Sequence, residues 1–150
     1  MNHKQLTMRK LLGFTLIELL IVMAILGILS AIGVGNFVSA RIKARDSARK
    51  LDLATVAKSL EAYANDHNGY PDALSFGTQF SDPDHPETIY AAKLPEDTSG
   101  YDYKYDSDNT SYTLYAHLEN TEDPSLLDTP IEGCGGTEPS CNYQITSSNQ

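Results

Sequence analysis

Residues 11–38, LLGFTLIELLIVMAILGILSAIGVGNFV, are the longest apolar stretch of the chain and hold one charged residue, Glu18. As an α-helix this stretch would be ~42 Å long. The hydrocarbon core of a bilayer is about 30 Å thick and is spanned by about 20 helical residues. The stretch is therefore long enough to cross a membrane as one helix.

Two ordinary interpretations of this stretch compete. A secretory signal peptide cut after Gly33 fits poorly, because the apolar core of such peptides is usually about 7–15 residues long. A plain membrane anchor leaves Glu18 unexplained, because an ionised carboxylate is costly in hydrocarbon and usually has a function there. The alternative that Glu18 simply lies at the membrane interface stays open.

The motif at residues 13–18, GFTLIE, follows a short leader with three basic residues, Lys4, Arg9 and Lys10. Together with the following LLIVMAILGIL at 19–29, it resembles the cleavage signal of type IV prepilins and type II secretion pseudopilins. The resemblance implies that residues 1–13 are a leader peptide, which a prepilin peptidase removes by cutting between Gly13 and Phe14. It also implies that the same enzyme methylates the new amine of Phe14.

Cleavage after Gly13 would remove the basic leader and keep the apolar stretch. It would also create a positive amine on Phe14, four residues before Glu18. Opposite charges attract strongly at low dielectric, and each is costly alone. We therefore hypothesise that Glu18 of one subunit pairs with the Phe14 amine of a neighbour and fixes the register of otherwise featureless apolar helices during assembly.

Beyond residue 37 the apolar residues recur at mostly helical spacing, which predicts an amphipathic helix with one buried face. The residues NDHNG at 65–69 and the following Pro71 mark its end. The sequence therefore predicts one nearly continuous helix from about 14 to 67. Residues 14–38 are its transmembrane and polymerisation part, and residues 39–118 form a globular domain that includes its amphipathic half.

Alternating tyrosines at 101, 103 and 105 precede a turn-rich segment, DSDNT at 106–110, and a second alternating run at 112–118. Two period-two runs around a turn predict a β-hairpin packed on helix residues 51–64. Residues 89–95 predict a short helical turn or strand, and 142–145 an edge strand. The predicted fold class is α+β, with a long N-terminal helix packed on a small antiparallel sheet. Residues 43–71 also resemble the pseudopilin family, and the resemblance implies this pilin-like fold.

Residues 119–150 are rich in Pro, Gly, Ser, Thr and acids, and predict an acidic C-terminal loop and tail. The tail holds both cysteines, Cys134 and Cys141. If it lies outside the cytoplasm, the short spacing favours a disulfide. A two-thiol metal site is the alternative, and it would need two further ligands of types that suit soft metals poorly.

We predict no metal or other cofactor. The acids and histidine at 82–87 suggest a solvated loop more than a metal site. The resemblance leaves calcium open, because major pseudopilins carry a calcium site in the C-terminal domain. Asp106 and Asp108 lack the glycine and distal glutamate of a helix–loop–helix calcium loop, and a plain hairpin turn is favoured.

The net charge is −9, and 18 of the 20 acidic residues follow Lys50. An acidic outer domain disfavours binding to nucleic acid and to anionic lipid. The segment 41–50 holds five basic residues, more than the leader, so charge counting alone would leave the C-terminal domain in the cytoplasm. The cleavage motif is the more specific signal, and it predicts a single-pass protein of the inner membrane with an extracytoplasmic domain, later part of a periplasmic or extracellular filament.

The predicted function is that of a structural subunit of a type II secretion pseudopilus or type IV pilus-like filament. The resemblance implies as partners other copies of the chain, the peptidase and methyltransferase, an inner-membrane assembly platform and minor pseudopilins. The alternative is a minor pilin that acts in adhesion or DNA uptake. An enzyme is not predicted, because the sequence holds no nucleophile-elbow, zinc-protease or phosphate-loop motif.

Overall fold

The computed structural model describes residues 13–135 and 140–147, with the backbone alone for residues 32–36 and 140. The predicted leader therefore lies outside the described residues, apart from Gly13. The chain divides into two compact units, Met1–Ser39 and Ala40–Gln150. The first unit contains the apolar part of the helix, and the second contains the rest of the helix and all the strands.

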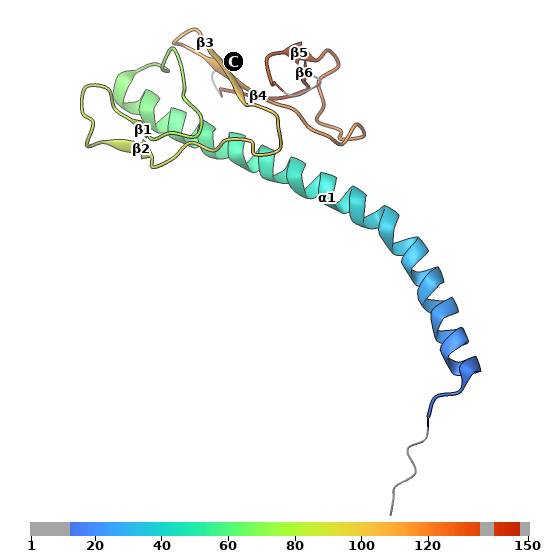
Figure 1. Cartoon of the computed structure of the whole chain (residues 1–150). Coiled ribbons are helices and arrows are strands. Elements are labelled where there is room, and N and C mark those ends of the chain that lie inside the picture. The colour runs from blue at the N-terminus through green and yellow to red at the C-terminus, as the bar shows by residue number, and fades with distance from the viewer. Residues whose placement is uncertain (1–12, 136–139, 148–150) are drawn as a thin grey trace, which may run out of the picture. The chain divides into compact units, whose positions relative to one another are not determined.

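One helix, α1 (Leu16–His67), accounts for the whole helical content of the described residues (Figure 1). The predicted helix from about 14 to 67 is confirmed. It ends where Asn68 takes a left-handed backbone conformation with φ of 55°. Gly69 follows, and a Cβ there would lie 3.0 Å from the carbonyl oxygen of Asn109. The same Cβ would lie 2.2 Å from the side-chain oxygen of Asn109, so glycine is favoured here because the chain passes close against Asn109 in the β-hairpin turn.

In the second unit, α1 buries one face. Leu53, Val56 and Leu60 are fully buried, and their spacing of three and four residues places them on one side of the helix. They pack in a single apolar core with residues of the strands and loops: Tyr70, Leu94, Tyr103, Tyr112, Leu114 and Ala116. This core is what joins α1 to the sheet.

Seven short strands form three antiparallel sheets with the orders β1-β2, β3-β4-β7 and β5-β6. Their bounds are β1 (Phe80–Ser81), β2 (Ile89–Ala91), β3 (Lys104–Ser107), β4 (Tyr112–Ala116), β5 (Ile131–Glu132), β6 (Ser140–Cys141) and β7 (Tyr143–Thr146). The α+β prediction is confirmed, with one long helix packed on small antiparallel sheets.

The predicted hairpin is present as β3 and β4, with Ser107 opposite Tyr112. Its first strand begins at Lys104 and not at Tyr101, because the amide of Asp102 donates to the carbonyl of Cys134 instead of pairing with β4. In β4 the buried and half-buried residues alternate as the sequence pattern predicts. The predicted edge strand is β7, which pairs with β4.

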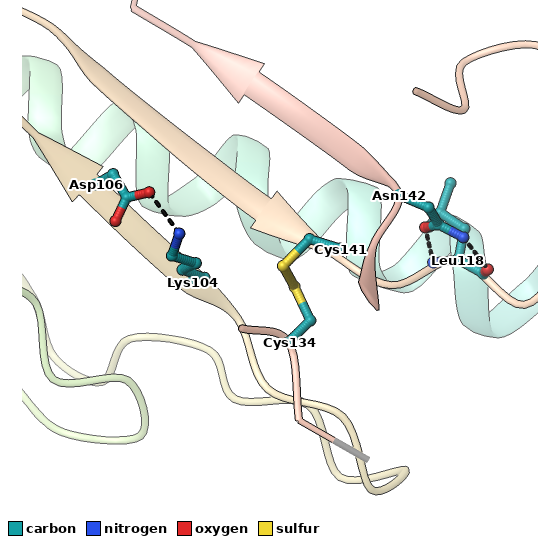
Figure 2. Close-up of a disulfide and its surroundings, with 6 residues drawn as sticks. All are labelled: Lys104, Asp106, Leu118, Cys134, Cys141 and Asn142. Carbon is teal, nitrogen blue, oxygen red and sulfur yellow. Dashed lines mark hydrogen bonds and ion pairs between the residues drawn. A yellow bond between two sulfur atoms is a disulfide. The ribbon is translucent and has the colours of Figure 1, made fainter. Parts of the chain in front are cut away.

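The acidic C-terminal region is folded onto the second unit and contributes β5, β6 and β7. Figure 2 shows how Asn142 fixes its path: the side-chain amide donates to the carbonyl of Leu118 at 2.8 Å, and the side-chain oxygen accepts from the amide of Leu118 at 2.6 Å. Leu118, Cys134 and Cys141 are fully buried or nearly so. This region therefore completes the core of the unit.

Among the described residues, no helix is both long and apolar enough to cross a membrane. The transmembrane role of residues 14–38 stays a prediction.

Candidate functional site

The start of α1 brings the predicted cleavage and assembly residues together. Phe14 is almost fully exposed. Thr15 precedes the helix, and its amide donates to Glu18 Oε2 at 2.8 Å while its hydroxyl donates to the same oxygen at 2.7 Å. The amide of Glu18 is 3.3 Å from the Thr15 hydroxyl oxygen. Thr15 and Glu18 thus form a capping box, in which each side chain serves the other residue's backbone amide.

The capping box was missed in the sequence, although its signal was present. A threonine three residues before a glutamate, at the start of an apolar run, is the pattern that marks such a helix start. Within one copy, Glu18 is therefore held by its own helix end. Any pairing with a neighbouring amine must share or replace these hydrogen bonds.

The helix beyond this cap has an unusual surface. From Phe14 to Leu29, every large apolar side chain is more than half exposed, and none is buried against the rest of its unit. Soluble monomers rarely expose apolar surface on this scale, and larger patches mark contact with proteins or membranes. The segment 14–31 therefore needs a covering environment that a single copy does not supply.

The second unit has its strongest charge interactions where α1 meets the loops. Arg49 is 2% exposed. Its Nε lies 2.6 Å from Asp97 Oδ2, its Nη1 lies 2.8 Å from Asp46 Oδ1, and its Nη2 lies 2.8 Å from Glu119 Oε1 and also donates to Ser99. One guanidinium thus joins the helix to two loops that are distant in sequence.

The acids around Arg49 are themselves held by other donors. Asp46, also 2% exposed, accepts from the backbone amides of Glu119 at 2.9 Å and Asn120 at 2.8 Å. Glu119 accepts two hydrogen bonds from the exposed Arg45. The hydrogen bonds from Arg45, joined by those from Arg49, hold the pKa of Glu119 at about 2 despite partial burial. We call Arg45, Asp46, Arg49, Asp97 and Glu119 the ion-pair cluster.

A second basic residue of α1 organises the loop that follows. The Lys50 ammonium lies 2.8 Å from both oxygens of Asp123 and 2.7 Å from the Ser125 hydroxyl. The hydrogen bond from Lys50 and those from Ser125 lower the pKa of Asp123 to about 2. Lys50 is therefore the cation that pairs with the acid of this loop. The described residues contain no group of three or more acidic, histidine or cysteine side chains that could hold a metal ion.

The acids and histidine at 82–87 lie in the loop between β1 and β2. Asp82 Oδ1 accepts from the amides of Asp84 and His85, and Oδ2 lies 2.9 Å from His67 Nε2 and accepts from Tyr90. Burial acts to raise the pKa of Asp82, but these hydrogen bonds, led by the two backbone amides, outweigh it and bring the pKa to about 2. Asp82 therefore ties the end of α1 to the β1–β2 connection.

The other candidate calcium pair is a hairpin turn. Asp108 Oδ1 accepts from the amides of Thr110 and Ser111 at 3.0 and 2.7 Å, and Asp106 pairs with Lys104 at 2.7 Å (Figure 2). These contacts are those of an aspartate turn between β3 and β4.

The two cysteines form a disulfide that closes the loop after β5 onto β6 (Figure 2). Both are fully buried. Replacing both by alanine is expected to reduce the free energy of unfolding by about 2–3 kcal/mol, because the unfolded chain regains the entropy of an open loop. Urea unfolding with and without reductant measures this. Reductant should have no effect on the double variant, and a variant as stable as the oxidised chain would contradict the expectation.

Comparison with known proteins places these features in one family. A family model described as the prokaryotic N-terminal methylation motif matches residues 8–34. The type II secretion system core protein G of Vibrio cholerae is 32% identical over 114 residues, which cover 71% of this chain and 78% of that protein. No solved structure was found to match.

Two pilus proteins are similar over shorter stretches. The type IV wide pilus major component PilA4 of Thermus thermophilus is 46% identical over 63 residues, or 42% of this chain and 48% of that protein. The type IV major pilin protein PilA of Myxococcus xanthus is 38% identical over 60 residues, or 40% of this chain and 27% of that protein. The methylation motif, the exposed apolar helix and these similarities agree, and the chain belongs to the family of type II secretion pseudopilins and type IV pilins, structural subunits of pseudopilus and pilus filaments.

Proposed function

We propose that this chain is a subunit of a type II secretion pseudopilus, anchored in the inner membrane by residues 14–38 before assembly. The single observation that carries the proposal is the exposed apolar segment 14–31, which begins at a capped glutamate and has no cover within its own unit. The similarity to core protein G over most of that protein's length supports the secretion pseudopilus over a pilus.

Processing removes residues 1–13 and leaves Phe14 as the methylated N-terminus. The cut lies one residue before the capping box, so the helix start and the apolar segment from Phe14 onward are kept. The apolar segment first lies in the membrane and then packs against copies of itself in the filament. Apolar side chains alone do not fix the register between neighbouring helices. The ion pair between Glu18 and a neighbour's Phe14 amine fixes it, because two buried opposite charges must lie side by side.

The second unit faces the extracytoplasmic side, where its disulfide is stable. The proposed partners are the prepilin peptidase, the inner-membrane assembly platform, minor pseudopilins and other copies of the chain. The acidic charge of the chain disfavours nucleic acid as a partner.

The intact mass and N-terminal sequence of the mature protein test the proposal. We expect a chain that begins at Phe14, carries one extra methyl group on its amine and contains one disulfide. A chain that begins at Val34 would show that the apolar stretch is a secretory signal and would overturn the proposal. A full-length chain that still carries residues 1–13 would overturn the processing step.

A further inference from the structure

The edge strand β7 is only lightly held by its own side chains. It pairs with β4, its one neighbour among the described strands. Its residues alternate between half-buried and exposed, so that Tyr143 and Ile145 pack on the core without being buried in it. Leu114 and Ala116 of β4, in contrast, are fully buried. A short strand with few buried contacts is the kind of segment that opens locally while the rest stays folded.

The hydrogen bonds that hold β7 in place are concentrated immediately before it, at Asn142. The side chain of Asn142 donates to the carbonyl of Leu118 and accepts from its amide, at 2.8 and 2.6 Å (Figure 2). The backbone of Asn142 donates to the carbonyl of Ala116 at 3.1 Å and accepts from the amide of Leu127 at 2.7 Å. These hydrogen bonds have to break when β7 and Asn142 leave β4.

The position of β7 also controls access to the disulfide. Both sulfur atoms belong to fully buried residues, and a thiolate exchanges with a disulfide only by reaching one of its sulfur atoms directly. One residue separates Cys141 from β7, so movement of β7 and Asn142 away from β4 carries Cys141 out of its buried position. Cys134 is held separately, because its carbonyl accepts from the amide of Asp102 at 2.7 Å. The closed strand therefore shields the bond, and the open strand exposes it.

We propose that local opening of β7, with α1, β3 and β4 still folded, is the step through which the bond between Cys134 and Cys141 is broken and formed. In the reducing direction, the thiolate of a dithiol attacks the sulfur of one cysteine, the S–S bond breaks, and the other cysteine leaves as a thiolate that takes up a proton. The second thiol of the reductant then displaces the first from the mixed disulfide. The dithiol is thereby oxidised to a disulfide, and both cysteines become thiols. Formation is the reverse, with a disulfide as the oxidant.

This coupling makes the edge of the sheet depend on the redox state of the chain. Because exchange needs the open strand, the bond has to form before β7 closes on β4, and it resists exchange once β7 is closed. A reduced chain opens more readily, and each opening leaves one edge of β4 without a partner, which invites pairing with another chain. The order of events in the cell rests on the proposed function: the bond would form after the second unit leaves the cytoplasm and before its sheet closes.

The test measures how fast dithiothreitol reduces the full, oxidised chain in non-ionic detergent, with the new thiols alkylated and counted by mass spectrometry. Asn142→Ala removes the two side-chain hydrogen bonds to Leu118 that break when β7 opens. We expect reduction to be about 10-fold faster, the factor that corresponds to ~1.4 kcal/mol for the two bonds. Gln144→Ala is the matched control, because it changes an exposed side chain of the same strand. Its rate should equal that of the parent.

Leu94→Ala separates local opening from global unfolding. Leu94 is fully buried, and its backbone hydrogen bonds go to Gly77 and Thr78 and not to β4 or β7. A cavity at such a position favours global unfolding by at least about 30-fold. We expect the reduction rate to change by less than about 2-fold, because Leu94 stays packed while β7 opens and distant sites act independently. A 30-fold acceleration, or one close to it, would show that the bond is reached only through global unfolding and would overturn the proposal.

The urea dependence of reduction gives the same distinction in the parent chain, should Leu94→Ala not fold. The slope of the logarithm of the rate against urea concentration measures the surface exposed in the opening step. We expect a slope well below that of equilibrium unfolding, because only an edge strand opens. Equal slopes would refute local opening, and reduction of Asn142→Ala at the rate of the parent would refute the part of β7 in it. Neither result touches the proposed function, which the mature N-terminus and the Glu18 variants test separately.

Discussion

Glu18→Gln is expected to abolish filament assembly while membrane insertion and removal of the leader continue. Glutamine fits the same place in a capping box, so the hydrogen bonds to the amide and hydroxyl of Thr15 are kept. Only the charge is lost. In the filament, the amine of a neighbouring Phe14 would then be buried without a partner, which should weaken association of subunits roughly 100-fold or more.

Thr15→Ala is the matched control for this change. It removes the hydroxyl that caps α1 and leaves the charge of Glu18 in place. Loss of a helix cap typically costs about 1 kcal/mol, which corresponds to about a 5-fold effect. The two variants therefore separate the local role of Glu18 at the helix start from its role between subunits.

The measurement is the amount of filament that can be sheared from cells, compared with the amount of processed protein in the membrane fraction. Glu18→Gln should give normal membrane protein and no filament, whereas Thr15→Ala should give reduced filament. Normal filaments from Glu18→Gln would show that the capping box, and not the charge, is the reason for the glutamate. Loss of processed protein in either variant would place the defect before assembly.

Much of the fold could be predicted because its signals are local. The helical period around Leu53, Val56 and Leu60 and the alternation in β4 are patterns within short windows, and both elements are present where expected. β3 begins three residues later than the predicted start at Tyr101, because the amide of Asp102 donates to the carbonyl of Cys134. No local sequence pattern indicates this contact. The capping box could have been predicted, since its two residues lie three apart.

The ion-pair cluster could not be predicted, because its partners lie far apart in the sequence. Arg49 meets Asp97 across 48 residues, and Arg45 meets Glu119 across 74. The cluster also gives part of the basic segment 41–50 a structural role. The five basic residues of 41–50 outnumber those of the leader and argued for a cytoplasmic domain. In the folded unit Arg45, Arg49 and Lys50 are all paired with acids of the same unit, so that three of these charges have a structural use.

Arg49→Ala is expected to reduce the free energy of unfolding by about 3–5 kcal/mol, the usual effect of removing one partner from a buried ion pair. Asp46, Asp97 and Glu119 would keep their charges without the guanidinium that links them, and Asp46 would stay buried. Arg49→Lys should recover only part of the loss, because a single ammonium cannot make the several directed hydrogen bonds of a guanidinium.

Urea unfolding of the full chain in non-ionic detergent, followed by the near-ultraviolet circular dichroism of its tyrosines, measures the loss. Arg45→Ala is the control, since Arg45 also binds Glu119 but its side chain is 44% exposed, against 3% for Arg49. Exposed ion pairs contribute little, so this variant should unfold close to the parent. Equal losses for the two variants would mean that burial does not determine the strength of the cluster.

The pH dependence of the free energy of unfolding is a second test of the role of Arg49. Hydrogen bonds from Arg45 and Arg49 hold the pKa of Glu119 at about 2, below its ordinary value of 4.5. A carboxyl whose pKa is lowered by folding stabilises the folded state fully above its unfolded pKa, and this stabilisation is lost as the pH falls towards the folded pKa. Arg49→Ala removes only the Arg49 share of this lowering, because Arg45 still binds Glu119. The difference between parent and variant should therefore be largest above pH 5 and shrink by that share as the pH is lowered from about 4.5 towards 2. A difference that stays constant over this range would show that Arg49 stabilises the unit by packing alone and not through its charge.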